Sequence, residues 1–301
     1  DTPGDVGTTI KTDREFTRES VADVAIAAGK RLSEALRTIE EYAKTLPPLP
    51  LGQARGEGKA ACDLAPAIER LRYRGYDLEQ RLNRALGTGL AKQWLLCVLL
   101  SESLCKSHDW QHVLDAALDA GADCVQLREK DLDEADLLHR ATQIVSRCRR
   151  SGATAIINDR PDIALLAGAD GVHLGQYDLP VTEVRKLVGR QLLIGVSTCH
   201  LDQARAAIGD GADYCGVGPM FDTTTKQKDT LAGPEYLKQF VEAFPTVPHL
   251  AIGGITPENV NQLIEAGARG IAVSSAICQA DQPDAVTQQL LAQLPITNQQ
   301  L

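Results

Sequence analysis

The feature that most constrains this chain is an alternation of short apolar runs with helical stretches, which fills residues 91–301. Eight runs have the length of strands and lie at residues 94–100, 124–127, 154–158, 171–173, 192–196, 214–217, 249–252 and 270–273. Stretches with helical periodicity separate them, among them residues 110–120, 134–149, 182–188, 201–209, 234–243 and 257–266. Because parallel strands need such crossovers, eight units in about 210 residues predict a (β/α)8 TIM barrel. A doubly wound sheet is the alternative, although no GxGxxG follows the first run.

A short phrase, Gly-Ala followed by Asp or Arg, repeats just before four of these runs. It begins at Gly121, Gly168, Gly211 and Gly267. Glycine at such a position ends a helix in the left-handed conformation. The repeat therefore favours a series of equivalent helix-to-strand junctions.

Residues 1–90 have a different pattern and predict an α-helical extension in front of a barrel domain at 91–301. Apolar residues at steps of four, three and four form one helix face, at Leu32, Leu36, Ile39 and Ala43. A second helical pattern runs from residue 68 to residue 86. Two helices bury little surface, so we expect them to pack on the barrel, on a partner or on residues missing upstream. Since the chain begins with Asp1 instead of Met, we expect a fragment.

Composition removes several classes of protein. The chain is 44% hydrophobic and 24% charged, which argues against disorder, and no apolar run approaches the ~20 residues of a membrane helix. Residues 1–90 carry 14 basic and 14 acidic groups, so the net charge of −9 lies in residues 91–301 and disfavours nucleic acid. The eight cysteines form no CxxC pair, which favours a reducing cytoplasm. We expect no nucleic-acid or membrane partner, and the question of a homo-oligomer stays open.

In a (β/α)8 barrel, functional groups lie at the carboxyl ends of the strands. After the second run, Gln126, Arg128 and Lys130 alternate along the chain, so an amide and two cations would point inward together. Such a group forms an anion clamp, with Arg as a planar fork and Lys as a point charge. The alternative is a solvated charged turn, because Arg and Lys are normally exposed.

Acidic residues follow the next two runs. Asp159 comes after the third and Asp178 after the fourth. Two carboxylates beside a cationic clamp suit a Mg²⁺ ion shared with a polyphosphate, because this ion takes oxygen ligands from protein and phosphate together. Alternatively, Asp159 caps a helix and Asp178 occupies a turn.

The later runs end in glycine and hydroxyl residues. Gly218-Pro219 leads to Thr223-Thr224-Thr225-Lys226, while Gly253-Gly254 and Ser274-Ser275 follow runs seven and eight. Many barrels bind phosphate after strands seven and eight, although the glycines could equally form simple turns. Together the strand ends predict one site for two phosphorylated molecules. His173, at the end of run four, has no assigned role.

These motifs resemble the thiamine-phosphate synthase family over roughly residues 94–295. The matching segments are 126–130, 158–159, 170–178, 195–197, 218–219, 223–226 and 253–255, in the family's order. The resemblance implies a transferase that joins hydroxymethylpyrimidine diphosphate to a thiazole phosphate, with Mg²⁺, giving thiamine monophosphate and pyrophosphate. The implied mechanism is dissociative: the diphosphate leaves first, and the thiazole nitrogen then captures a pyrimidine carbocation.

The resemblance also implies roles for individual residues. The pyrimidine diphosphate would be held by Gln126, Arg128, Lys130, Asn158, Ser197 and Lys226, of which Arg128, Lys130, Ser197 and Lys226 would be catalytic. Asp159 and Asp178 would bind Mg²⁺, and the thiazole phosphate would contact Thr223, Thr225, Gly254, Ser274 and Ser275. Arg160 stands where many members have a second Asp, and Asp222 replaces a frequent Pro. The extension is similar to that of longer bacterial forms.

Two other functions compete with this interpretation. A thiazole tautomerase has the same barrel and binds thiazole phosphate without coupling it, but it does not need Asp178 or Thr223–Lys226 for a metal-bound diphosphate. A non-catalytic regulatory or scaffold protein would not need acids and cations at every ligand position. Both features favour the synthase.

Overall fold

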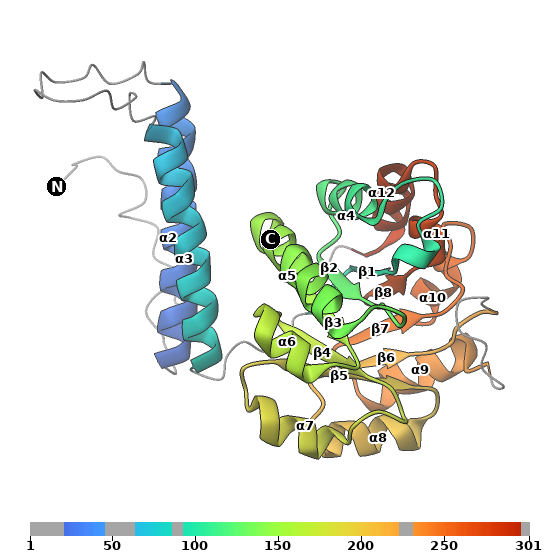
Figure 1. Cartoon of the computed structure of the whole chain (residues 1–301). Helices are drawn as coiled ribbons and strands as arrows, with labels where there is room; N and C mark the ends of the chain where they lie inside the picture. Colours follow the sequence, from blue (N-terminus) through green and yellow to red (C-terminus); the bar gives the residue numbers. More distant parts are fainter. Residues whose placement is uncertain (1–20, 46–63, 86–92, 223–230, 296–301) are drawn as a thin grey trace, which may run out of the picture. The chain divides into compact units, whose positions relative to one another are not determined.

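A computed structural model describes residues 21–45, 64–85, 93–222 and 231–295. Its eight parallel strands close into a barrel in sequence order (Figure 1). They are β1 Leu96–Leu100, β2 Cys124–Leu127, β3 Thr154–Asn158, β4 Gly171–Leu174, β5 Leu193–Thr198, β6 Tyr214–Val217, β7 His249–Ile252 and β8 Ile271–Val273. The predicted TIM barrel is confirmed, and the doubly wound alternative is wrong because β8 pairs with β1.

Helices follow the strands and surround the barrel (Figure 1). They are α4 Trp110–Asp119, α5 Glu134–Ser151, α6 Pro161–Ala167, α7 Val181–Val188, α8 Leu201–Gly209, α9 Gly233–Ala243, α10 Val260–Glu265, α11 Ser275–Cys278 and α12 Pro283–Gln293, with a short 3-10 helix, η2, at Glu102–Leu104. The predicted helix at 257–266 begins later, at Val260, because the Asn259 side chain bonds the Thr256 N–H and the Gly254 carbonyl.

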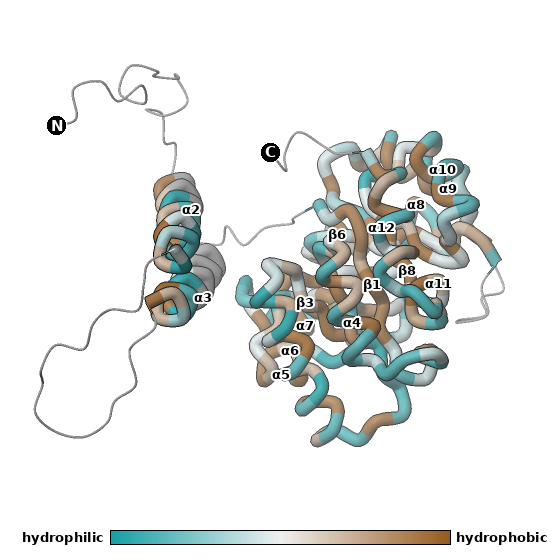
Figure 2. Tube along the Cα trace, turned by 90° about the horizontal axis from the view of Figure 1, so that it is seen from above, coloured by the Kyte–Doolittle hydropathy of each residue, from teal (hydrophilic) through white to brown (hydrophobic). Residues whose placement is uncertain are grey.

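Alternation along each strand divides the core into two layers. Outward residues such as Val98 and Val125 pack against the surrounding helices. Inward residues fill the barrel, where Trp94, Leu99 and Tyr214 belong to one cluster. A parallel sheet covered by helices is buried on both faces, which is why β1 reads as a continuous apolar run (Figure 2).

The repeated Gly-Ala-Asp phrase has a structural role at the amino ends of the strands. The four glycines have φ between +68° and +105°, as expected for helix ends. The aspartates do more than the sequence suggested, since their carboxylates accept backbone N–H groups at 2.7–3.0 Å: Asp123 from Leu95 and Leu96, Asp170 from Ala155, and Asp213 from Ile194. Each of the three phrases that contain Asp therefore ties two neighbouring strands together.

The chain divides into two compact units, Asp1–Gly89 and Leu90–Leu301. In the first, α2 Val21–Thr45 packs on α3 Leu64–Ala85. A Cβ added to Gly75 would lie 3.6–3.7 Å from methyl groups of Leu36 and Leu32, so the helices approach closely there. The Arg72 guanidinium lies 2.7 Å from Glu40 and lowers the pKa of that carboxyl. No helix among the described residues is long and apolar enough to cross a membrane.

Candidate active site

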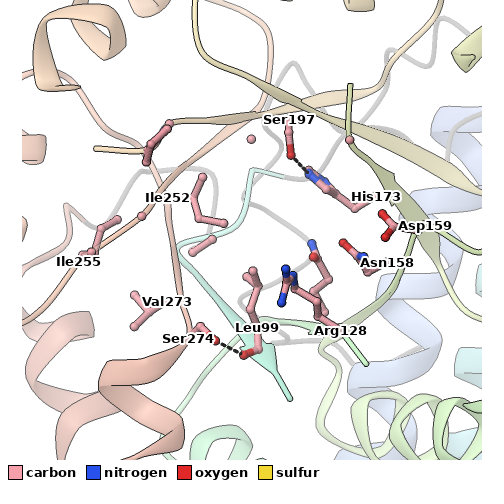
Figure 3. Close-up of a pocket in the computed structure, with 18 of the residues that line it drawn as sticks. Leu99, Arg128, Asn158, Asp159, His173, Ser197, Ile252, Ile255, Val273 and Ser274 are labelled. Carbon is pink, nitrogen blue, oxygen red and sulfur yellow. Dashed lines mark hydrogen bonds between the residues drawn. The ribbon is translucent and has the colours of Figure 1, made fainter. Parts of the chain in front are cut away.

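A cavity of about 360 Å³ opens at the carboxyl ends of the strands, and all eight strands or their following loops line it (Figure 3). Ten of the predicted site residues lie on its wall: Gln126, Arg128, Lys130, Asn158, Asp159, Asp178, Ser197, Gly254, Ser274 and Ser275. Thr223, Thr225 and Lys226 fall outside the described residues. The structure therefore brings together, in one cavity, every predicted site residue that it describes, although their roles stay predictions.

The cationic part of the cavity depends on strand alternation after β2. Gln126 is buried, and Arg128 is fixed by its backbone N–H, which donates to the Leu100 carbonyl at 2.9 Å. Between the two cations, Glu129 turns away and forms a 2.7 Å ion pair with Arg140 on α5. Within the described part of the chain, neither Arg128 nor Lys130 has a carboxylate partner. Their charges are therefore available to an anionic ligand, which disfavours a purely solvated turn.

Asp159 reaches the cavity through an unusual backbone conformation. Its φ is +62°, in the left-handed region that few residues other than glycine adopt, and its N–H donates to the His173 carbonyl at 2.8 Å. The residue at the N-cap position of α6 is Arg160, and its side chain makes no capping hydrogen bond.

Asp178 lines the same cavity as the cations and also stabilises its own loop. Its Oδ2 accepts the Gly175 N–H at 2.5 Å, so the turn role and the site position coexist. Among the described residues, no group of three or more His, Cys, Asp or Glu side chains is arranged to hold a metal. Two carboxylates do fit a Mg²⁺ ion that takes its remaining oxygen ligands from phosphate and water.

Two glycines after β7 allow the loops around the cavity to touch. Gly253 and Gly254 have φ of +107° and +63°, and a Cβ on Gly254 would overlap the Asp222 backbone. After β8, the Ser274 hydroxyl donates to the Leu99 carbonyl at 2.9 Å. This end of the cavity therefore presents closely packed backbone and hydroxyl groups, which suits a phosphate.

His173 is more than an isolated core histidine. It is 7% exposed, and its Nδ1 lies 3.0 Å from the Tyr214 hydroxyl, while its Nε2 lies 3.0 Å from Ser197 Oγ (Figure 3). Burial raises the pKa of Tyr214 well above its ordinary value, so this hydroxyl keeps its proton. Sequence reasoning missed the link because it joins three strands. The usable signal was alternation, which places His173, Tyr214 and Ser197 inside the barrel.

Gln176 is a second residue that sequence reasoning left without a role. Its side-chain amide donates to the Ser197 carbonyl at 2.6 Å, and it lines the cavity beside Asp178. The loop after β4 is thereby tied to the end of β5. The signal available in the sequence was its position in the loop that carries Asp178.

The comparisons with known proteins agree with this geometry. A family model described as thiamine monophosphate synthase matches residues 96–277, and one described as the ThiD2 family matches residues 1–81. Thiamine-phosphate synthases of Nostoc punctiforme and Gloeobacter violaceus are 39% and 41% identical over 98% of this chain, covering 78% and 81% of their own lengths.

Among solved structures, the thiamine phosphate pyrophosphorylase from Pyrococcus furiosus has a TM-score of 0.60 and 31% identity, covering 68% of this chain and 95% of that one. A 3-hexulose-6-phosphate synthase, at 19% identity and a TM-score of 0.54, shares the barrel fold. The expected family resemblance is confirmed by the sequence matches. The chain belongs to the thiamine monophosphate synthase family.

Proposed function

We propose that this protein is a thiamine-phosphate synthase. It condenses 4-amino-2-methyl-5-hydroxymethylpyrimidine diphosphate with 4-methyl-5-(2-phosphoethyl)thiazole, or with its carboxylated form, to give thiamine monophosphate and pyrophosphate, with loss of CO2 when the carboxylated form reacts. The observation that carries the proposal is the convergence of Arg128, Lys130, Asp159 and Asp178 on one cavity, in a chain whose family membership covers that barrel.

The pyrimidine diphosphate is assigned to the half of the cavity formed by β2, β3 and β5. Arg128 and Lys130 bind the diphosphate oxygens, and Lys226 contributes a third cation from the loop after β6. Gln126 and Asn158 hold the aminopyrimidine through their amides, and Ser197 through its hydroxyl. Charge-assisted hydrogen bonds of this kind are about twice as strong as neutral ones, so most of the binding energy comes from the cations.

Asp159 and Asp178 are assigned to Mg²⁺. Bound there, the ion would neutralise charge on the diphosphate as it becomes a leaving group. The backbone N–H of Asp159 is bonded to the His173 carbonyl and the Asp178 carboxylate accepts the Gly175 N–H, so both residues are positioned before the ligand arrives. Such preorganisation avoids a reorganisation cost during the reaction.

The thiazole phosphate is assigned to the loops after β6, β7 and β8. Gly254, Ser274 and Ser275 lie on the wall of the cavity, and we assign Thr223 and Thr225 to the same phosphate from their place in the sequence after β6. Since the Ser274 hydroxyl hydrogen is engaged by the Leu99 carbonyl, Ser274 offers the phosphate its backbone N–H and not its side-chain donor.

The reaction needs leaving-group stabilisation more than a strong base. The bond between the pyrimidine methylene carbon and the diphosphate oxygen breaks, and its electron pair leaves with pyrophosphate. The thiazole nitrogen lone pair then forms the new C–N bond. Arg128, Lys130 and Lys226 stabilise the departing anion, and Ser197 keeps the pyrimidine ring in place for attack.

Phosphorylated small molecules are therefore the proposed partners, and the cytoplasm is the proposed compartment. All seven cysteines that the structure describes are free, which is typical of a reducing environment. We assign residues 1–90 to a helical module outside the coupling site and residues 91–301 to the catalytic barrel.

The test is a coupling assay with the purified full chain. Thiamine monophosphate should form only when both substrates and Mg²⁺ are present, and chelation should abolish the product. A tautomerase would instead interconvert thiazole phosphate carboxylate isomers without the pyrimidine. A scaffold protein would do neither, and either outcome would refute the proposal.

A further inference from the structure

Two glycines create the space in which three polar side chains of the barrel interior meet. In the strand register, His173 pairs with Gly195, and Gly195 pairs with Tyr214, so the three lie in one row across β4, β5 and β6. A Cβ on Gly195 would overlap the Tyr214 ring. Tyr214 therefore crosses over Gly195 to reach His173, and glycine at 195 is required by this contact.

The second row lies two residues further along the strands, on the same face. Ser197 pairs with Gly216, and a Cβ on Gly216 would meet the His173 ring at 3.0 Å. The His173 imidazole on β4 therefore lies over Gly216 on β6. From there its Nε2 contacts Ser197 on β5. Trp94 closes the other side of Tyr214, with ring centroids 4.9 Å apart at 77°. The imidazole and the phenol are thus held by packing as well as by hydrogen bonds.

The direction of these hydrogen bonds follows from the Tyr214 hydroxyl. It is buried, and the only acceptor found for its hydrogen among the described residues is His173 Nδ1, at 3.0 Å. If Nδ1 carried the proton, the buried Tyr214 O–H would lack an acceptor, which is unfavourable. Tyr214 therefore donates to Nδ1, and the neutral imidazole carries its proton on Nε2.

This tautomer determines what Ser197 can do. Nε2–H donates to Ser197 Oγ at 3.0 Å, so the serine oxygen accepts from the histidine and its own hydrogen is free for the cavity. We propose that Tyr214 and His173 are positioning residues that fix the Ser197 hydroxyl as a hydrogen-bond donor, and that its acceptor is a ring nitrogen of the aminopyrimidine. The inference rests on the proposed function for the identity of the ligand and on the barrel geometry for the tautomer.

The first test reads the tautomer directly in the full chain without substrate. ¹⁵N NMR of protein labelled at its six histidines distinguishes protonated from unprotonated ring nitrogens. The His173 signals are identified by their loss in His173→Gln. We expect the proton on Nε2 in the parent and loss of this preference in Tyr214→Phe. A proton on Nδ1 in the parent would overturn the proposal.

The second test separates positioning from general stability. Tyr214→Phe should raise KM for the pyrimidine diphosphate by about ten-fold, in line with one hydrogen bond, and leave KM for the thiazole phosphate unchanged. Tyr236→Phe is the matched control: its hydroxyl donates to Thr198 Oγ1 at 2.8 Å, it is also buried, and it does not line the cavity. Equal KM changes in the two variants, or none in Tyr214→Phe, would refute the assignment.

A third comparison covers the case in which Tyr214→Phe fails to fold. His173→Gln keeps an amide donor near the position that Nε2 occupies in the parent, whereas His173→Leu removes the donor. The His173→Gln variant should therefore retain at least ten-fold more coupling activity than His173→Leu, a difference of about 1.4 kcal/mol. Equal activity of the two would contradict the proposal. If the parent does not couple the substrates at all, the proposed function fails while the NMR result still decides the tautomer.

Discussion

His249 at the start of β7 makes the stability of the barrel depend on pH in a calculable way. The ring is completely buried and packs edge-on against Phe240. Its Nε2 accepts the Arg269 N–H at 3.4 Å, which requires that nitrogen to be unprotonated. Burial, assisted by the positive charge of Arg269, lowers the pKa of His249 from 6.5 to about 4. The folded state therefore keeps this imidazole neutral where an unfolded chain would protonate it.

The sign and size follow from proton linkage. Between pH 6.5 and pH 4 the unfolded chain binds a proton at His249 that the folded chain does not, so the free energy of unfolding falls as pH falls. Each unit of pKa difference corresponds to 1.36 kcal/mol, so the full window costs about 3 kcal/mol. Against a typical total of about 5–15 kcal/mol this is a large fraction.

The measurement is urea unfolding of the parent and of His249→Gln at several pH values. Because other groups titrate in the same range, the difference between the two proteins is the quantity to follow. The parent should lose about 3 kcal/mol relative to the variant between pH 7.5 and pH 4. His139→Gln on α5 controls for loss of an exposed imidazole, since surface substitutions change stability by under about 0.5 kcal/mol. Parallel pH curves for parent and His249→Gln would refute the reasoning.

Three further predictions concern the site and the extension. Asp159→Asn or Asp178→Asn should lower Mg²⁺-dependent coupling by orders of magnitude. The barrel should stay folded, since Asn tolerates the left-handed conformation at residue 159. Parent-like turnover in the variant with both residues replaced would contradict the metal assignment. Arg128→Ala should mainly raise KM for the pyrimidine diphosphate, and Ser274→Leu mainly that for the thiazole phosphate; identical kinetic defects would refute the division of the cavity. A variant that begins at Leu90 should couple both substrates at the parent rate when they are saturating, but it should be less soluble. If this variant has the circular dichroism spectrum of a folded protein and yet does not couple the substrates, the extension belongs to the active site.

The strands could be predicted because buried parallel strands are apolar on both faces and are separated by helices. The errors have local causes. Trp94 belongs to the apolar run but precedes β1, since its ring fills the barrel interior and its indole N–H donates to Thr154 Oγ1 at 2.8 Å. β5 continues to Thr198, beyond the predicted end, because Thr198 still pairs with Val217.

The polar wall of the cavity could be predicted where one strand's alternation was sufficient, as at Gln126 and Arg128. Contacts between segments that are distant in the sequence could not be predicted, and they became visible only in the structure. Asp159 has a left-handed backbone and its N–H donates to the His173 carbonyl, and no pattern in the sequence encodes that contact. The contact between Tyr214 and His173 depends on the register of three strands, which hydrophobicity alone does not fix.

We propose that this one barrel replaces a diphosphate leaving group with a thiazole nitrogen. ³¹P NMR of the full chain with both substrates and Mg²⁺ follows every phosphorus atom in the reaction at once. We expect pyrophosphate and thiamine monophosphate to appear in equal amounts and at the same rate, and neither to appear when the thiazole phosphate is omitted. Release of pyrophosphate without consumption of the thiazole phosphate, or no change in any signal, would contradict it.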